Sequence, residues 1–249
     1  MNIGLYQSAS SLSALEQWQD VVSRNITSSD QTAYKKRTIT FSAQLAGEVR
    51  SDPRRPLGHD GGTSMLFPKV NNGINFAYGE TQPTRRDLDV AIQGEGFFEV
   101  QRPDGSKVYT RSGEFRMRPD RTLVTSGGDE VMSTGGNPIL LSAAGGPLVI
   151  NENGTIVQGS TPLGRLAVQK FEDNSKLIPL SGGAFTAPDG VTPEAVDNPS
   201  LLQGYIEGAN TSSLREMVDL VLISRAYEAN QKMITTVDQE MGKALEALG

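Results

Sequence analysis

Residues 213–248, with the sequence SLREMVDLVLISRAYEANQKMITTVDQEMGKALEAL, show the strongest structural pattern of this 249-residue chain. Ser213 and Glu216 match the Ser-x-x-Glu capping box that marks the start of a helix. After them, one helical face repeats at alternating spacings of three and four, and it is almost entirely non-polar or aromatic. Its members are Leu220, Ile223, Tyr227, Asn230, Ile234, Val237, Met241, Ala244 and Leu248. The pattern predicts a continuous helix over residues 214–248, about 52 Å long at a rise of 1.5 Å per residue.

The first residues of the chain show a weaker pattern of the same kind. Between Ile3 and Ser28, most positions at heptad spacing are apolar, and Ser8 and Gln19 are the exceptions. The apolar members are Leu5, Leu12, Leu15, Val22 and Ile26, with Trp18 beside them. We therefore expect a second amphipathic helix over about residues 3–28.

A single amphipathic helix has no stable way to keep its apolar side out of water, so each end of the chain needs a partner. The obvious partner is the other end, and we expect the two helices to pair as a coiled-coil-like stem. This pairing leaves flanking residues for contacts with further copies or other subunits, namely Trp18, Met217, Val218, Leu222 and Met233. The alternative is that both helices simply pack against the body of the protein.

The predicted subunit interface combines residues from both helices. It consists of Leu5, Leu12, Leu15, Trp18, Val22, Ile26, Leu220, Ile223, Tyr227, Asn230, Ile234, Val237, Met241 and Leu248. Asn230 is the polar member of the C-terminal pattern. Such a residue either fixes the register and the number of partners or lies on the surface where the pattern drifts. Both interpretations remain open at this point.

Glycine and proline separate the two helical ends from a middle that is rich in turns. Proline occurs only between Pro53 and Pro199, and 16 glycines lie within residues 91–190. Alternating apolar residues predict short antiparallel strands, with hairpin turns at Pro103–Gly105 and Asn153–Gly154. Strands are expected near residues 88–92, 97–100, 108–110, 115–117, 123–124, 139–141, 148–150, 155–157 and 163–171.

Together these patterns predict an α+β fold in which a mainly antiparallel β domain is inserted between two long helices. The expected segments are an N-terminal helix at 1–32, an extended linker at 33–84, the β domain at 85–203 and a C-terminal helix at 204–249. No apolar run is long enough to predict a membrane-spanning helix. The start of the chain has neither the basic residues nor the apolar core of a cleaved signal peptide. The protein is therefore expected to stay in the cytoplasm or to be exported by a pathway that does not require a cleaved signal peptide.

The composition excludes several kinds of chemistry. The chain has no cysteine, which excludes disulfides, thiolate metal sites and a cysteine nucleophile. Its one histidine, His59, lies in a loop rich in proline and glycine, where a solvated side chain is expected. The net charge of −6 argues against nucleic acid as a partner. Because Gly94 and Gly96 open no helix, they are no dinucleotide-binding motif. We expect no enzymatic activity, metal, cofactor or small-molecule substrate.

Two sets of charged residues allow another interpretation. The clusters Lys35–Arg37 and Arg54–Arg55 could steer an acidic partner, although a solvated face is the expected role. Asp87, Asp89 and Glu95 could serve a soluble carbohydrate-active or carbohydrate-binding β domain with helical arms. Carboxylates two residues apart at a strand edge commonly face solvent, and that is the expectation here.

Three blocks of sequence resemble the flagellar rod and hook family of bacterial axial proteins. The most specific is QGYIEGAN at residues 203–210, followed by RAYEANQK at residues 225–232. The second is DVAIQGEGFF at residues 89–98, with YTRSG at residues 109–113. The third consists of Gly4-Leu5-Tyr6, Arg24-Asn25-Ile26 and Tyr34-Lys35. These blocks frame nearly the whole chain in the order that the family shows.

This resemblance implies a structural subunit that is exported through the flagellar export apparatus without a cleaved signal peptide. It implies assembly with copies of itself and with other rod subunits into a hollow helical rod of the basal body, which crosses the periplasm. The terminal helices would form the inner tube and the β domain the outer layer. The chain length and the segment Leu163–Val168 favour the proximal rod, with the distal rod or hook as the alternative. The absence of cysteine suits export into an oxidising compartment.

Two residues depart from the pattern of the family. Arg24 stands where the family usually has an asparagine before Asn25, and Ala33 stands where it usually has a glycine. Because alanine disfavours positive φ angles, the turn after the first helix is expected to differ from that of the family.

Overall fold

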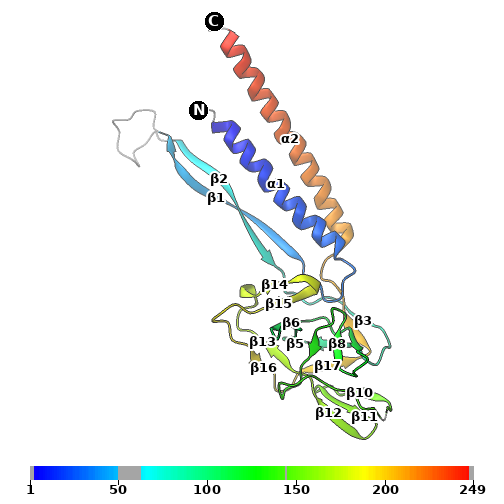
Figure 1. The fold of residues 1–249 in the computed structure, drawn as a ribbon. Coiled ribbons are helices and arrows are strands. Elements are labelled where there is room, and N and C mark those ends of the chain that lie inside the picture. Colours follow the sequence, from blue (N-terminus) through cyan, green and yellow to red (C-terminus); the bar gives the residue numbers. More distant parts are fainter. Residues whose placement is uncertain (1–2, 50–62, 144, 247–249) are drawn as a thin grey trace. The chain divides into compact units, whose positions relative to one another are not determined.

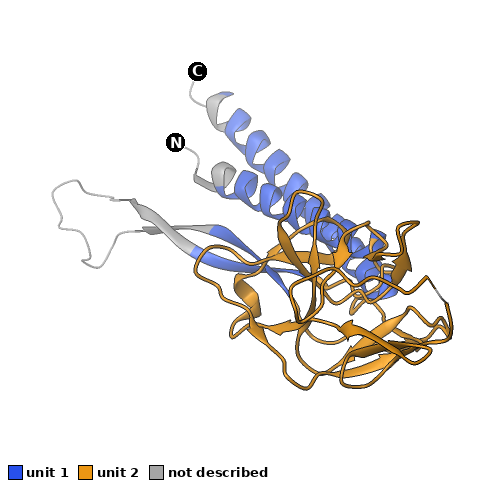
Figure 2. Cartoon of the chain, turned by 60° about the horizontal axis from the view of Figure 1, so that its bottom comes forward, with its two compact units in different colours: residues 1–27, 37–74, 212–249 blue, residues 28–36, 75–211 orange. Residues whose placement is uncertain are grey.

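The computed structural model describes residues 3–49, 63–143 and 145–246. The chain divides into two compact units, and each unit is discontinuous in sequence (Figure 2). Unit 1 comprises residues 1–27, 37–74 and 212–249, and unit 2 comprises residues 28–36 and 75–211. The described residues do not include Arg54, Arg55, His59 and Leu248, which are among the candidate functional residues of the sequence.

Unit 1 contains two long helices that lie side by side and run antiparallel (Figure 1). Helix α1 spans Ile3–Thr27 and helix α2 spans Ser213–Glu246, close to the ranges that the sequence periodicity predicts. Within the described part of the chain, no helix is both long and apolar enough to cross a membrane.

A long β hairpin completes unit 1, in the range that the sequence predicts as an extended linker. Strand β1, Arg37–Val49, pairs antiparallel with strand β2, Thr63–Ile74, and the ladder contains one bulge. Helix α1 contacts both strands, and the Trp18 ring meets the Phe41 ring edge-on at 5.8 Å between centroids. The mixed composition of this range gives no strong strand pattern, so the hairpin escapes prediction from the sequence.

Unit 2 is built from short antiparallel strands around one apolar core. The strands are β3 Thr81–Pro83, β4 Val90–Gln93, β5 Phe97–Gln101, β6 Lys107–Thr110, β7 Phe115–Met117, β8 Leu123–Thr125, β9 Glu130–Val131, β10 Leu148–Ile150, β11 Thr155–Gln158, β12 Thr161–Arg165, β13 Val168–Lys170, β14 Ile178–Pro179, β15 Ala184–Thr186, β16 Glu194–Ala195, β17 Ser200–Gln203 and β18 Tyr205–Glu207. Short 3-10 helices lie at Asn174–Lys176 and Ser181–Gly183. The largest sheet runs β14-β15-β6-β5-β9-β8-β7, and its core includes the fully buried Phe98, Phe115 and Leu123.

The first and last strands of unit 2 are joined by backbone hydrogen bonds. Strand β17 pairs with β4 and strand β18 pairs with β3, both antiparallel. This pairing brings residues near position 205 beside residues near position 80, although more than a hundred residues separate them in sequence. Unit 2 is therefore closed by its own ends rather than by a local hairpin.

Most of the expected strands are confirmed, because alternation between turns is a local pattern. The predicted turns at 103–105 and 153–154 join β5 to β6 and β10 to β11, and Gly154 has a positive φ of 86°. Residues 139–141 are an exception, since Leu140 forms only an isolated bridge with Thr122. The expected strand near 163–171 is divided into β12 and β13.

Ala33 adopts the backbone conformation that its side chain disfavours. Its φ is 57°, the left-handed conformation that glycine would adopt without strain. For an L-residue this conformation costs roughly 1–2 kcal/mol. The residue is completely buried, and its N–H donates a 2.7 Å hydrogen bond to the carbonyl oxygen of Glu207. Packing and this hydrogen bond hold the alanine in the strained turn.

Candidate subunit interface

Two side-chain contacts define how α1 and α2 face each other. Near the end of α1, the Asn25 amide donates a 3.0 Å hydrogen bond to the Glu216 carboxylate in the first turn of α2. Near the start of α1, the Ser8 hydroxyl donates to the Met233 sulfur at 3.7 Å. The interval from Ser8 to Asn25 and the interval from Glu216 to Met233 are both 17 residues. The two helices therefore keep one antiparallel register over about 26 Å.

The interface residues predicted from periodicity lie mainly on the covered sides of the two helices. Val22 and Ile223 are buried, with 2% and 1% of their surface exposed. The half-buried members are Leu12, Leu15, Trp18, Ile26, Leu220, Tyr227, Asn230, Ile234 and Val237. Met241, near the end of α2, is 42% exposed. Leu5 lies in α1, but its side chain is outside the described set.

The opposite side of α2 is also apolar near the start of the helix. Five residues at positions i, i+3, i+4, i+7 and i+8 share this side and are 50–73% exposed. They are Leu214, Met217, Val218, Val221 and Leu222, and we call them the α2 stripe. Contiguous apolar patches on protein surfaces are commonly interaction sites, so the α2 stripe is a candidate subunit interface.

The sequence predicts only part of this exposed surface. Met217, Val218 and Leu222 are expected as flanks of the helix pair, and all three are exposed. Leu214 and Val221 are missed, although the spacing of the α2 stripe could have revealed them. Of the other expected flanks, Met233 is 58% exposed, whereas Trp18 is half-buried beside Phe41.

Unit 2 contains a buried ionic cluster that joins three segments far apart in sequence. The Glu207 carboxylate lies 2.6 Å from the Lys35 ammonium and 2.6 Å from the Arg111 guanidinium. These three side chains are at most 3% exposed. The Tyr78 ring covers both cations, at 5.7 Å from Lys35 and 4.8 Å from Arg111. Further hydrogen bonds run from the two cations to the carbonyl oxygens of Ala77, Ile92, Gly94 and Gly96.

The expected solvated role of the Lys35–Arg37 cluster is wrong for Lys35. Its carboxylate partner lies 172 residues away in sequence, so no local pattern indicates burial. Lys36 and Arg37 are only half-buried. The backbone N–H of Lys36 donates to the Asn210 side chain at 2.6 Å, which adds another link between the same two segments.

The protonation of this cluster follows from its burial and its charges. Burial lowers the pKa of Lys35, since a low-dielectric site disfavours the charged form, although Glu207 opposes this effect. Burial alone would raise the pKa of Glu207. The Arg111 charge, the Gly79 N–H and Lys35 together outweigh burial and hold that pKa below its usual value. Glu207 is therefore an ionised carboxylate between two cations.

The lowered pKa of Glu207 predicts a loss of stability in acid. Near the unfolded-state pKa of about 4.3, the unfolded chain binds more protons than the folded chain, so the free energy of unfolding falls as pH decreases. In the variant Glu207→Gln this contribution is absent. Urea unfolding between about pH 3 and pH 6 should give a steeper pH dependence for the wild type than for the variant. Asp104 and Asp120 titrate in both proteins, so their contributions to the pH dependence cancel in the comparison. Parallel curves of the free energy of unfolding against pH for the two proteins would contradict the prediction.

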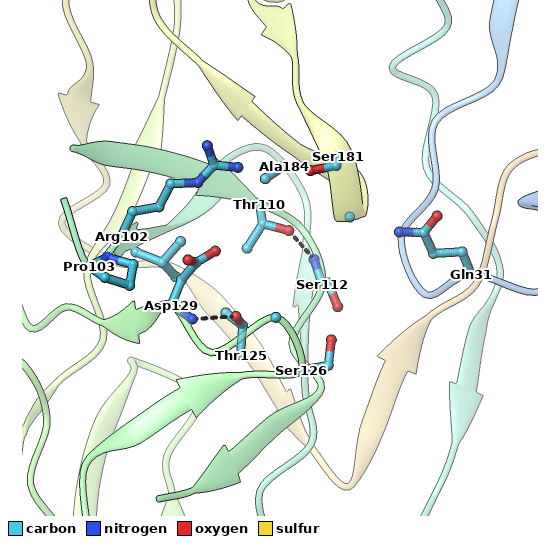
Figure 3. Close-up of a pocket in the computed structure, with 13 residues that line it drawn as sticks. Gln31, Arg102, Pro103, Thr110, Ser112, Thr125, Ser126, Asp129, Ser181 and Ala184 are labelled. Carbon is cyan, nitrogen blue, oxygen red and sulfur yellow. Dashed lines mark hydrogen bonds between the residues drawn. The ribbon is translucent and has the colours of Figure 1, made fainter. Parts of the chain in front are cut away.

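Unit 2 contains a hollow of about 460 Å³ (Figure 3). Arg102 and Asp129 are the charged side chains among its described lining residues. The Thr110 hydroxyl donates to the Gly183 carbonyl, and the Thr125 hydroxyl accepts the N–H of Asp129. These hydroxyls are engaged by the backbone, whereas an activated nucleophile needs a side-chain base within hydrogen-bonding reach. The hollow is also lined by Ser112, Ser126 and Ser181. None of the described lining hydroxyls forms a hydrogen bond with a side-chain base.

The carboxylates of the alternative enzymatic interpretation do not converge. Asp87 and Glu95 are exposed, whereas Asp89 is buried at 1% and forms a 3.3 Å ion pair with Arg86. The expectation that Asp89 faces solvent is thus wrong, because β17 and the Gly204 N–H cover this part of the chain. None of the three lines the hollow described above.

Two family models match separate parts of the chain. The model described as the flagellar hook protein FlgE/F/G D1 domain matches residues 91–158. The model described as the flagellar basal body rod FlgEFG protein C-terminal matches residues 202–247. The first match covers β4 to β11 in unit 2, and the second runs from β17 through α2.

Curated relatives extend over the whole chain. The flagellar basal-body rod protein FlgF of Caulobacter vibrioides is 30% identical over 251 residues, covering 100% of this chain and 99% of the relative. The flagellar basal-body rod protein FlgG of Agrobacterium fabrum is 31% identical over 236 residues, covering 88% and 89%. The FlgF protein of Rhizobium meliloti is 27% identical over 257 residues, covering 100% and 99%.

Proposed function

This chain belongs to the family of flagellar hook and basal-body rod proteins, and from that premise we propose that it is a structural subunit of the flagellar rod. The relatives that align along their whole length are named basal-body rod proteins. We further propose that α1 and α2 form the contacts between neighbouring subunits. In this proposal the partners are copies of the same chain and other rod subunits.

The two-sided apolar character of α2 is the observation that supports this interface. One side of the helix, around Ile223, is covered within the chain, while the α2 stripe on the other side is exposed. A helix that is apolar on both sides is stable only when both sides are covered. Unit 1 supplies one cover, and a neighbouring subunit would supply the second.

The rival interpretation as a carbohydrate-active enzyme lacks structural support. Asp87, Asp89 and Glu95 form no shared site, and no described hydroxyl that lines the hollow of unit 2 forms a hydrogen bond with a side-chain base. The relatives also carry names of structural rod proteins. A mechanical role therefore accounts for the chain better than a catalytic one.

We propose the proximal rod as the position of this subunit, with the distal rod or hook as the alternative. Two FlgF relatives align over 100% of this chain and 99% of their own lengths, whereas FlgG alignments cover between 88% and 96% of this chain. This difference supports the proximal rod over the distal rod or hook. We place the assembled subunit in the periplasmic rod, after passage through the flagellar export apparatus without a cleaved signal peptide.

The proposed mechanism couples ordering of the helices to assembly. Burial on the covered side of α2 decreases from Ile223, 1% exposed, to Met241, 42% exposed. The far end of α2 thus has little cover within one chain and gains order when a neighbour packs against it. Interlocking of many such helices would allow the rod to transmit torque.

The α2 stripe gives the direct test of this proposal. The substitution Leu222→Asp places a charge on an exposed apolar site. The free energy of unfolding of the isolated subunit should therefore stay within about 0.5 kcal/mol of the wild-type value. In the assembly the charge would be buried without a partner, and incorporation should fall by about tenfold or more. Basal bodies isolated from cells that produce only the variant, probed with an antibody to this chain, measure incorporation.

Ser224→Asp is the matched control, because Ser224 is exposed on α2 but lies to the side of the α2 stripe. It introduces the same charge and should leave incorporation unchanged. If Leu222→Asp incorporates as well as Ser224→Asp, the α2 stripe is not a subunit interface. Family membership would stand in that case, and the assembly surface would have to lie elsewhere.

A further inference from the structure

A buried amide in unit 1 connects three separate elements. Asn25 is 1% exposed, and its Nδ2 donates to the Arg37 carbonyl oxygen at 2.9 Å and to the Glu216 carboxylate at 3.0 Å. Its Oδ1 accepts the backbone N–H of Arg37 at 2.9 Å. The side chain thus joins the end of α1 to the start of β1 and to the first turn of α2.

The apolar pattern of the two helices does not by itself define their register. On both helices covered apolar or aromatic residues repeat with a period of seven, as in the steps from Leu15 to Val22 and from Tyr227 to Ile234. Sliding one helix by seven residues along the other therefore brings apolar positions opposite apolar positions again. Apolar packing alone would tolerate such a shift, so a more specific contact has to select the observed register.

The contact between Asn25 and Glu216 cannot survive such a shift. Glu216 is itself 1% exposed, so its carboxylate depends on partners inside unit 1. A slide of seven residues would separate the two groups by about 10 Å along the helix axis. It would break the hydrogen bond between the buried amide and the buried carboxylate, although Asn25 could keep its two bonds to the Arg37 backbone. Loss of a buried hydrogen bond to a carboxylate is strongly unfavourable.

We propose that Asn25, acting through Glu216 and Arg37, is the positioning residue that sets the register of α1 against α2. This inference concerns a single chain and holds whether or not the α2 stripe is a subunit interface. Its consequence for assembly is that every subunit presents the α2 stripe at the same height relative to α1.

Asn230, the polar residue on the covered side of α2, does not have this geometry. Its amide donates a 3.1 Å hydrogen bond to the Ala226 carbonyl oxygen of its own helix. That bond is kept in any register. Asn230→Leu therefore serves as the matched control for Asn25→Leu, since both remove an asparagine from the paired helices.

The absence of cysteine allows the register to be read by engineered thiol pairs. Ser8 contacts Met233, so the pair Ser8→Cys with Met233→Cys reports the observed register. Ser8→Cys combined with Ala226→Cys or with Glu240→Cys reports shifts of seven residues in either direction. Each pair is made in the wild-type, Asn25→Leu and Asn230→Leu chains, and intramolecular linkage by a short thiol cross-linker is measured by mass spectrometry. Far-UV circular dichroism records the helix content of each chain.

The wild-type and Asn230→Leu chains should link position 8 mainly to position 233. In the Asn25→Leu chain, linkage to 233 should fall severalfold while linkage to 226 or 240 rises. Linkage to 233 that stays at the wild-type level would overturn the proposal. An equal fall at all three positions would also overturn it, because the residue would then only hold the helices together without selecting their register.

Discussion

Replacing Glu207 with leucine is expected to lower the free energy of unfolding of unit 2 by about 3–5 kcal/mol. The substitution removes the one carboxylate that lies between Lys35 and Arg111 and leaves two buried cations side by side. It also removes the acceptor of the Gly79 N–H. Removal of one partner from a buried ion pair is costly because the remaining charge has lost both water and its counter-ion.

Equilibrium unfolding in urea, followed by circular dichroism in the β-sheet region, measures this loss. Glu80→Leu is the matched control, since Glu80 is an exposed glutamate beside the same pair of strands. The control should change the free energy of unfolding by no more than about 0.5 kcal/mol. If both variants show the same small decrease in the free energy of unfolding, water reaches the two cations and the cluster contributes little to the stability of the fold.

The sequence reveals the helices of this protein because their signal is local. Ile223, Tyr227 and Ile234 follow a spacing that any window of a few turns contains. The ranges predicted from this periodicity, about 3–28 and 214–248, agree closely with α1 and α2, whereas the broader segment 204–249 also includes strand β18. The same holds for strands such as β5 and β6, where alternation and a Pro-Asp-Gly turn lie within fifteen residues.

The ionic cluster could not be found in this way. Lys35 resembles a solvated lysine because its neighbours in sequence are charged, and Glu207 lies within a motif that gives no hint of burial. Their contact depends on the pairing of β18 with β3, which joins residues far apart in sequence. The contact of Asn25 could not be predicted for the same reason, because its partner Glu216 is 191 residues away in sequence.

The pattern on the covered side of α2 also concealed the second apolar side. When Leu220 and Ile223 are assigned to the covered side of α2, the sequence pattern makes Leu214 and Val221 resemble ordinary surface residues. Only their measured exposure, 73% and 50%, together with their common side, distinguishes a strip from isolated residues. Sequence periodicity therefore predicts the covered side of α2 better than its exposed apolar side.

Replacing Gly113 with alanine should destabilise unit 2 by about 3 kcal/mol or more. A Cβ at this position would overlap the carbonyl oxygen of Val90 and lie 3.1 Å from the Phe98 ring. Relief would require the backbone to move, because the Val90 N–H donates to the Gly113 carbonyl at 3.0 Å and fixes the two segments together. Urea unfolding measures the loss, with Gly127→Ala as control, since a Cβ there meets nothing closer than 3.6 Å.

The two large effects should also be coupled. Gly113 follows Arg111 by two residues, so a backbone displaced from Val90 also moves the guanidinium away from Glu207. Part of the free energy that Gly113→Ala loses then comes from weakening the same ion pair that Glu207→Leu removes. The double variant should therefore lose less free energy of unfolding than the sum of the two single variants. The shortfall should be about 0.5–3 kcal/mol, the range for residues that share a network. Strict additivity would mean that the close crossing at Gly113 and the ionic cluster stabilise unit 2 independently.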